Sequence, residues 1–204
     1  MQIDKNLESL ITESYLDCCE ELQKMQEDSK FDSDRFSCAK AQESRLVESF
    51  VKHGLKAETV SFFFRKRGVI DKFHFLDLVH GDIFIFYEDR LIALDLKMGL
   101  NKESPGSISA KSLQFFSGNG DKELWSLCPI QHLYLCGFGL GSKELYIIDA
   151  KDLFNAVKKT HLAWKDSYKK SDLIDYDVYN ARVKESDFIS KDFLLKNFSK
   201  KEKI

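Results

Sequence analysis

Segment 91–97, Leu-Ile-Ala-Leu-Asp-Leu-Lys, places a carboxylate and an ammonium group where they could act together. Side chains alternate between the two faces of a β-strand, so Asp95 and Lys97 project from one face while the intervening apolar side chains project from the other. A charge on a strand that is otherwise apolar is costly unless it is paired or binds a metal ion. The pattern therefore predicts that both charged groups have further partners.

A second carboxylate comes from the preceding strand. Segment Asp82–Tyr87 is β-prone and is separated from the first segment by only three residues, which is the layout of a β-hairpin. If Glu88 and Asp89 form a two-residue turn, Asp82 lies opposite Asp95 with Cβ atoms about 5 Å apart. Two carboxylates at that distance repel each other unless a cation lies between them. Since no Cys or His cluster competes, we expect the hard divalent ion Mg²⁺ rather than zinc.

A third carboxylate lies on a predicted helix. In segment Cys38–His53 the apolar residues recur at helical spacing, and Gly54 supplies the stop. Glu43 shares the apolar face, whereas Glu48 is rotated from it by about 140° at 100° per residue. The helical phase predicts that Glu43 faces inward and that Glu48 is solvated.

In chain order, the sequence carries Glu43 on a predicted helix, Gly81-Asp82 at the start of a strand and, after twelve intervening residues, Asp95-Leu96-Lys97. This order resembles the motif of the PD-(D/E)xK nuclease superfamily. That superfamily includes restriction endonucleases and archaeal-type Holliday junction resolvases. The amino-acid sequence of the predicted helix after Glu43 also resembles that of the resolvase branch, in which an acidic residue is followed by Leu-Val and by a glycine that ends the helix. The resemblance covers about Cys38–Phe116. Gly81 departs from the family, which commonly has proline there, and this affects the turn before the ligand rather than the ligand.

The resemblance implies hydrolysis of phosphodiester bonds in DNA. Asp82, Asp95 and the backbone carbonyl of Leu96 would bind Mg²⁺, with Mn²⁺ as an expected substitute. Glu43 would bind through water or help to hold a second ion. Lys97 would orient the attacking water or stabilise the developing negative charge.

Four further residues are candidates for substrate contacts. The family expectation is that a helix after the motif contributes a polar side chain, and Lys111 and Gln114 are the candidates. Arg65 and Arg67 lie in a basic run that would neutralise backbone phosphates, although a solvated turn fits that run equally well.

Periodicity and turn residues predict the elements around the site. They are a helix from Asp4, its N-cap, to Met25, a polar connection at Glu27–Ser37, the helix Cys38–His53, a strand at Thr59–Phe64 followed by a charged turn, the hairpin, a short helix capped by Ser107 or Ser109 and running to Phe116, strands at His132–Phe138 and Glu144–Ile148, a helix at Asp149–Lys159, and a frayed end at Ser199–Ile204. A second Asp-x-Lys at Asp149 has no upstream hairpin partner, so we interpret Asp149 as a helix N-cap.

This order predicts an α/β fold, a sandwich around a mixed sheet. The resemblance narrows it to a restriction-endonuclease-like α/β/α sandwich with an added N-terminal helix. We expect one nuclease domain over 1–204, composed of an N-terminal helical extension and connection (1–37), a catalytic core (38–160) and a C-terminal helical and polar segment (161–204).

Composition limits the alternatives. The 204 residues carry 31 Lys+Arg against 33 Asp+Glu, a net charge of −2, so bulk charge does not drive DNA binding. No apolar run is long enough for a membrane span and no secretory signal opens the chain, which predicts a cytoplasmic protein. The cysteines form no C-x-x-C pair, so we expect reduced thiols and no iron–sulfur cluster.

The expected activity is that of a type II restriction endonuclease-like enzyme acting on double-stranded DNA. A homodimer is expected, because cutting both strands calls for two active sites related by a two-fold axis. Two alternatives stay open: a structure-specific endonuclease of the Holliday junction resolvase kind, acting on branched DNA, and a catalytically silent nucleic-acid or protein-binding module of the same fold.

Overall fold

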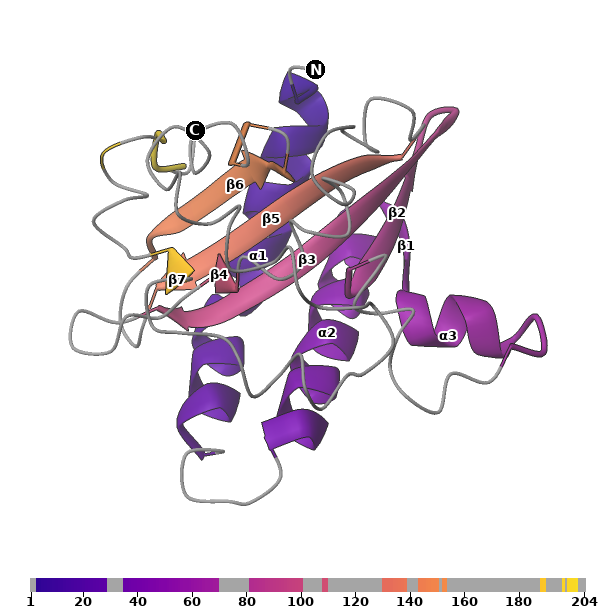
Figure 1. Cartoon of the computed structure of the whole chain (residues 1–204), viewed down its shortest axis with the longest axis horizontal. Coiled ribbons are helices and arrows are strands. Elements are labelled where there is room, and N and C mark those ends of the chain that lie inside the picture. The colour runs from indigo at the N-terminus through magenta and orange to yellow at the C-terminus, as the bar shows by residue number, and fades with distance from the viewer. Residues whose placement is uncertain are drawn as a thin grey trace, which may run out of the picture.

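The computed structural model describes residues 3–28, 35–69, 81–100, 108–109, 130–138, 143–150, 152–153, 188–189, 196 and 198–201. Its elements in chain order are α1 (Lys5–Asp28), α2 (Arg35–Lys52), β1 (Lys56–Thr59), α3 (Val60–Arg65), β2 (Ile83–Tyr87), β3 (Arg90–Leu100), β4 (Ile108–Ser109), β5 (Gln131–Phe138), β6 (Leu145–Asp149) and β7 (Phe188–Ile189). Strands and helices are thus combined in one α/β arrangement (Figure 1).

Five strands form a mixed sheet in the order β1-β2-β3-β5-β6, and β4 pairs with β7 in a separate two-stranded sheet. Strands β1, β2 and β3 are antiparallel neighbours, β3 and β5 are parallel, and β5 and β6 are antiparallel. Tyr87 pairs with Arg90 and Ile83 pairs with Leu94, so the predicted hairpin and its two-residue turn at Glu88-Asp89 are confirmed.

Helices α1 and α2 lie side by side against one face of the sheet (Figure 1). The alternation of the strands supplies the apolar face that they cover, since Ile83, Ile85, Ile92 and Leu94 all belong to the buried cluster beneath them. Helix α3 packs on the opposite face at the β1–β2 edge, where its Val60 is buried with other side chains of β2 and β3. The described residues thus form a two-helix layer on one face of the sheet and one short helix at the edge of the other.

Local signals set the ends of the first two helices. The Asp4 carboxylate accepts hydrogen bonds from the backbone N–H groups of Asn6 and Leu7, both at 3.0 Å, which confirms the predicted N-cap. Gly54 follows α2 with φ of 86°, and the N–H of the buried Leu55 donates to the carbonyl of Phe50 at 2.9 Å. This is the Schellman pattern that ends a helix in a left-handed glycine.

Segment Thr59–Phe64 was expected to be a strand, and that prediction is wrong. The strand β1 ends at Thr59, whose hydroxyl accepts from the N–H of Phe62 at 3.3 Å and so begins helix α3. Phe63 and Phe64 then pack their rings against Phe84 on β2. A local cap and aromatic packing therefore override the β-propensity of this segment.

Two further expectations need correction. Ile108 and Ser109 form strand β4, which contradicts a helix that begins directly after a Ser107 cap; the alternative cap at Ser109 is not contradicted, because an N-cap residue itself has extended backbone. Residues 110–129 lie outside the described part of the chain. The end of the chain is not frayed at Lys201, because its N–H donates to the carbonyl of Leu145 at 2.7 Å and its ammonium pairs with Glu8.

Two other findings bear on the sequence expectations. The four cysteines within the described ranges, Cys18, Cys19, Cys38 and Cys136, are free thiols. No helix in those ranges combines the length and apolar character needed to cross a membrane.

Helix α1 approaches the sheet closely at Gly137 on β5. A Cβ atom built on this glycine would clash with the Tyr15 hydroxyl and would lie 2.9 Å from both Tyr15 Cζ and Met98 Sδ. Tyr15 is fully buried, so it has little room to retreat. The absence of a side chain at position 137 is therefore what lets Tyr15 dock.

We predict that Gly137→Ala lowers the free energy of unfolding by about 1–3 kcal/mol, because the added methyl overpacks the α1–sheet contact. Urea denaturation measures the loss. In a Tyr15→Phe background the same substitution should cost less, because the hydroxyl is the nearest atom that it meets. An equal cost in the two backgrounds would place the strain elsewhere.

Candidate active site

The site begins where β3 runs past the start of β2. Ile83, the first residue of β2, pairs with Leu94, so within the described ranges the residues of β3 after Leu94 have no strand partner on that side. Asp82 fills part of this gap. Its N–H donates to the Leu94 carbonyl at 2.9 Å, and its carboxylate accepts from the N–H of Leu96 at 2.7 Å. A side chain thus continues the ladder and fixes the carboxylate at the strand end.

The chain enters this position through Gly81. Its φ is 79°, in the left-handed region that L side chains disfavour, and an added Cβ would lie 3.0 Å from the Leu94 carbonyl oxygen. Proline is confined to φ near −65° and cannot adopt this conformation. Gly81 therefore enters β2 by a turn that the proline common at this place in PD-(D/E)xK nucleases could not form.

Asp95 and Lys97 project from the same face of β3, as the alternation predicts, and their side chains form an ion pair. The two side chains are only 15% and 26% exposed. Burial opposes the charge on the Lys97 ammonium, but the Asp95 and Asp82 carboxylates outweigh it and raise the pKa of Lys97. Lys97 therefore stays protonated across the physiological pH range.

Glu43 is the inward-facing acid of α2. It is 3% exposed, whereas the side chain of Glu48 is 72% exposed, so the prediction from helical phase is confirmed. The Lys40 ammonium lies 2.9 and 3.0 Å from the two Glu43 carboxylate oxygens. The helix therefore presents a buried carboxylate that is already paired with a cation.

Electrostatics connects these groups into one cluster. Burial raises the pKa of Asp82 well above its usual value, and the carboxylates of Asp95 and Glu43 raise it further. The Lys97 ammonium and the Leu96 N–H act in the opposite direction. The charge state of Asp82 on the β2 side is thus coupled to Asp95 and Lys97 on β3 and, by a smaller amount, to Glu43 on α2.

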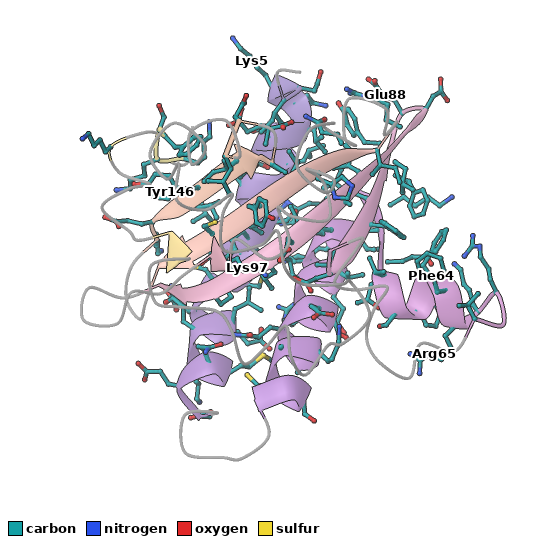
Figure 2. All side chains as sticks on the ribbon, viewed as in Figure 1. Lys5, Phe64, Arg65, Glu88, Lys97 and Tyr146 are labelled. Carbon is teal, nitrogen blue, oxygen red and sulfur yellow. The ribbon has the colours of Figure 1, made fainter. Side chains whose placement is uncertain are left out.

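The neighbouring strand β5 adds two side chains that the sequence patterns did not identify. Tyr134 pairs with Asp95 and Cys136 pairs with Lys97 in the parallel register, so both project from the same face as the charged pair. Tyr134 is 2% exposed and Cys136 is fully buried. Figure 2 shows Lys97 near the middle of the sheet, on the face turned away from α1 and α2. Alternation within β5 could have identified both residues only if the β3–β5 register had been known.

The candidate substrate residues have different outcomes. Arg65 and Arg67 are exposed at the end of α3 and in the turn after it, with no contact to the carboxylates in the described ranges. The first residue of α3 is nevertheless tied to the site, because the Val60 N–H donates to the Asp82 carbonyl at 2.9 Å. Lys111 and Gln114 lie outside the described residues.

Asp149, the aspartate of the second Asp-x-Lys, lies elsewhere. It ends β6, and Ala150 after it is helical, which agrees with a position at a helix start. Its carboxylate accepts a hydrogen bond from the Gln131 side chain at 2.9 Å. The first Asp-x-Lys and the second therefore occupy different surroundings.

No group of three or more His, Cys, Asp and Glu side chains in the described ranges is arranged as a metal site. Comparison with known proteins gives no relative: no family model matches the chain, and neither a curated protein nor a solved structure matches it at a significant level. The chemistry of the site is therefore argued from its own geometry.

We predict that Asp82→Asn stabilises the metal-free protein increasingly as pH rises. The folded pKa of Asp82 lies above its unfolded value near 3.9, so its favourable contribution is complete below that unfolded value and is lost as pH rises through the folded pKa. Asparagine does not titrate. Urea denaturation in EDTA from about pH 4 to about pH 8 should show that the free energy of unfolding of the variant increases relative to that of the parent as the pH rises.

Asp17→Asn is the control with the opposite sign. The exposed Asp17 pairs with Lys52, which lowers the pKa of its carboxyl, so its contribution is present above the unfolded pKa and is lost as pH falls. The free energy of unfolding of Asp17→Asn should therefore decrease relative to that of the parent as the pH rises. A pH-independent difference for Asp82→Asn would contradict the electrostatic description of the cluster.

Proposed function

We propose that this chain is a Mg²⁺-dependent endonuclease that hydrolyses phosphodiester bonds in DNA, with the active-site arrangement of the PD-(D/E)xK superfamily. One observation carries the proposal. Asp82, which precedes the Ile83–Leu94 pair, accepts a hydrogen bond from the Leu96 N–H of β3, and burial and the neighbouring Asp95 carboxylate, paired with Lys97, raise its pKa. A purely structural strand end gains nothing from two neighbouring carboxylates, because like charges repel each other.

The oxygen donors fit a hard divalent cation. Asp82 and Asp95 offer carboxylates, and the Leu96 carbonyl is directed to the same side of the strand as its N–H, which donates to Asp82. The repulsion that raises the pKa of Asp82 is what a cation between the carboxylates would relieve. These residues would hold Mg²⁺ or Mn²⁺, and Glu43 would bind through water or help to hold a second ion. The bound ion would polarise the scissile phosphate and lower the pKa of a water molecule.

Lys97 acts as a fixed cation in this proposal. Its raised pKa keeps the ammonium charged, so it orients water or stabilises negative charge that develops on the phosphate, and it does not serve as a general base. Partial burial strengthens its interaction with an anion, because less water screens it.

The favoured substrate is double-stranded DNA cut by a homodimer, as in type II restriction endonucleases, since two strands require two active sites. Branched DNA is the alternative substrate, and the resemblance of the α2 sequence to that of the resolvase branch favours it. The mixed sheet, covered on one face by α1 and α2 and contacted at one edge of the other by α3, is compatible with an α/β sandwich of the restriction-endonuclease kind. A silent binding module is the alternative of another class.

We predict that Asp95→Ala and Lys97→Ala each reduce cleavage by about 100-fold or more, because each removes a group that acts on the reacting phosphate. The protein is incubated with supercoiled plasmid, linear duplex and a four-way junction, in Mg²⁺ or in EDTA. Discrete fragments from linear DNA would indicate a restriction enzyme, and symmetric nicks confined to the junction would indicate a resolvase. No cleavage of any substrate, or undiminished cleavage by both variants, would refute the nuclease assignment.

The two glutamates of α2 provide a matched pair. Glu43→Gln should reduce cleavage by about 10-fold or more, because a supporting ligand is lost. Glu48→Gln removes the same charge from the same helix but from its solvated face, and should cleave as the parent does. The ratio of the initial cleavage rates of the two variants in Mg²⁺ measures how much the buried carboxylate contributes to cleavage beyond the solvated one. Equal rates would exclude Glu43 from the site.

A further inference from the structure

Helix α3 and the turn after it carry an exposed aromatic ring among cations. Phe62 is 49% exposed, and Arg65, Lys66 and Arg67 follow it as exposed residues. We call these four residues the α3 surface. Single exposed apolar side chains are common on proteins, but an exposed ring beside three consecutive cations combines two kinds of recognition in one place.

The three phenylalanines of α3 divide between packing and exposure. Phe63 and Phe64 pack against Phe84, with ring centroids 5.0 and 6.1 Å apart, and the Arg67 guanidinium lies 3.6 Å from the Phe63 ring centroid. These contacts hold α3 against the sheet. Figure 2 shows Phe64 and Arg65 projecting from opposite sides of the helix.

Phe62 does not take part in that packing. Among the described residues, no other ring stacks on it, and the nearest cations, Lys66 Nζ and Arg65 Cζ, lie 5.5 and 6.0 Å from its ring centroid. These separations exceed the stacking distance at which Arg67 covers Phe63. The Phe62 ring is thus accessible to a planar ligand, with cations at its margin for an anionic group.

An aromatic ring beside cations matches the chemistry of an unpaired nucleotide. A base stacks on an aromatic side chain, and the neighbouring phosphates pair with Lys and Arg. Bases inside a duplex already stack on each other and are not accessible to such a ring. The ligand that fits the α3 surface is therefore a nucleic acid with a base outside the helical stack.

The α3 surface is rigidly connected to the carboxylate cluster. Thr59 pairs with Ile83, the Val60 N–H donates to the Asp82 carbonyl, and the Lys66 ammonium pairs with Glu58 on β1. We propose that the α3 surface binds an unpaired nucleotide of the DNA whose backbone is hydrolysed at the cluster, with Phe62 stacking on the base and Arg65 neutralising a phosphate. This inference rests on the proposed nuclease function and, between the two substrates proposed there, favours branched DNA with unpaired nucleotides over an intact duplex.

The test is fluorescence anisotropy in EDTA with three labelled oligonucleotides of one sequence: a single strand, a blunt duplex and a duplex with splayed arms. The parent should bind the single strand and the splayed duplex more tightly than the blunt duplex. Phe62→Ala should weaken binding of the single strand and of the splayed duplex by about fivefold or more and leave binding of the blunt duplex unchanged. Phe62→Trp should keep the preference for the single strand and the splayed duplex. Val51→Ala, at an exposed valine on α2, should bind as the parent does.

Salt titration tests the charged part of the surface. Arg65→Gln should reduce the slope of log affinity against log salt by about 0.7 for the single strand, as expected when one phosphate contact is lost. The inference is overturned if the parent prefers the blunt duplex, if Phe62→Ala binds the single strand as tightly as the parent, or if none of the oligonucleotides binds, in which case a protein partner fits the surface better.

The inference and the proposed function fail separately. Cleavage that needs Mg²⁺ and Asp95, with binding insensitive to Phe62, would overturn the inference and retain the nuclease. Binding that depends on Phe62 without cleavage of any substrate would overturn the nuclease and leave a nucleic-acid-binding module with an α3 surface.

Discussion

The register of the β2–β3 hairpin is the constraint on which the candidate site depends. Ile83 and Ile85 pair with Leu94 and Ile92, and all four side chains are buried under α1 and α2. A slip of one residue would turn Asp95 toward that apolar cluster, at the cost of burying an unpaired charge. Packing on one face of the sheet therefore fixes which side chains meet on the other, and the hydrogen bond from the Leu96 N–H to Asp82 secures the end of the ladder.

The same residues that build the site also destabilise it. Burial and two neighbouring carboxylates raise the pKa of Asp82, and Lys97 and the Leu96 N–H oppose this effect. Lys40 and Lys97 reduce the repulsion by pairing with Glu43 and Asp95. A cluster assembled for stability alone would place its acids in water, as Glu48 is placed. Strained electrostatics that packing maintains is a common mark of functional sites, where one kind of ligand offsets the repulsion.

Local rules predicted much of this arrangement from the sequence. A two-residue turn and strict alternation gave the positions of Asp82, Asp95 and Lys97, and helical phase separated Glu43 from Glu48, because each inference spans only a few residues of one chain segment. The contribution of β5 could not be predicted in this way. Tyr134 and Cys136 reach the site through a parallel pairing with β3, and its register depends on contacts between segments far apart in the chain. Lys201 pairs with Leu145 through the same kind of distant contact.

Two of the places where local reasoning gave a wrong or an incomplete answer are adjacent in space. Thr59–Phe64 has the composition of a strand, yet a threonine cap and ring packing against Phe84 turn the chain into α3 immediately beside Asp82. Gly81 enters β2 by a left-handed turn that proline cannot form. Both features direct the backbone around one carboxylate, so the local sequence here is constrained by the placement of Asp82 more than by intrinsic propensity. Conflict between local preference and observed structure is expected where a protein positions a functional group.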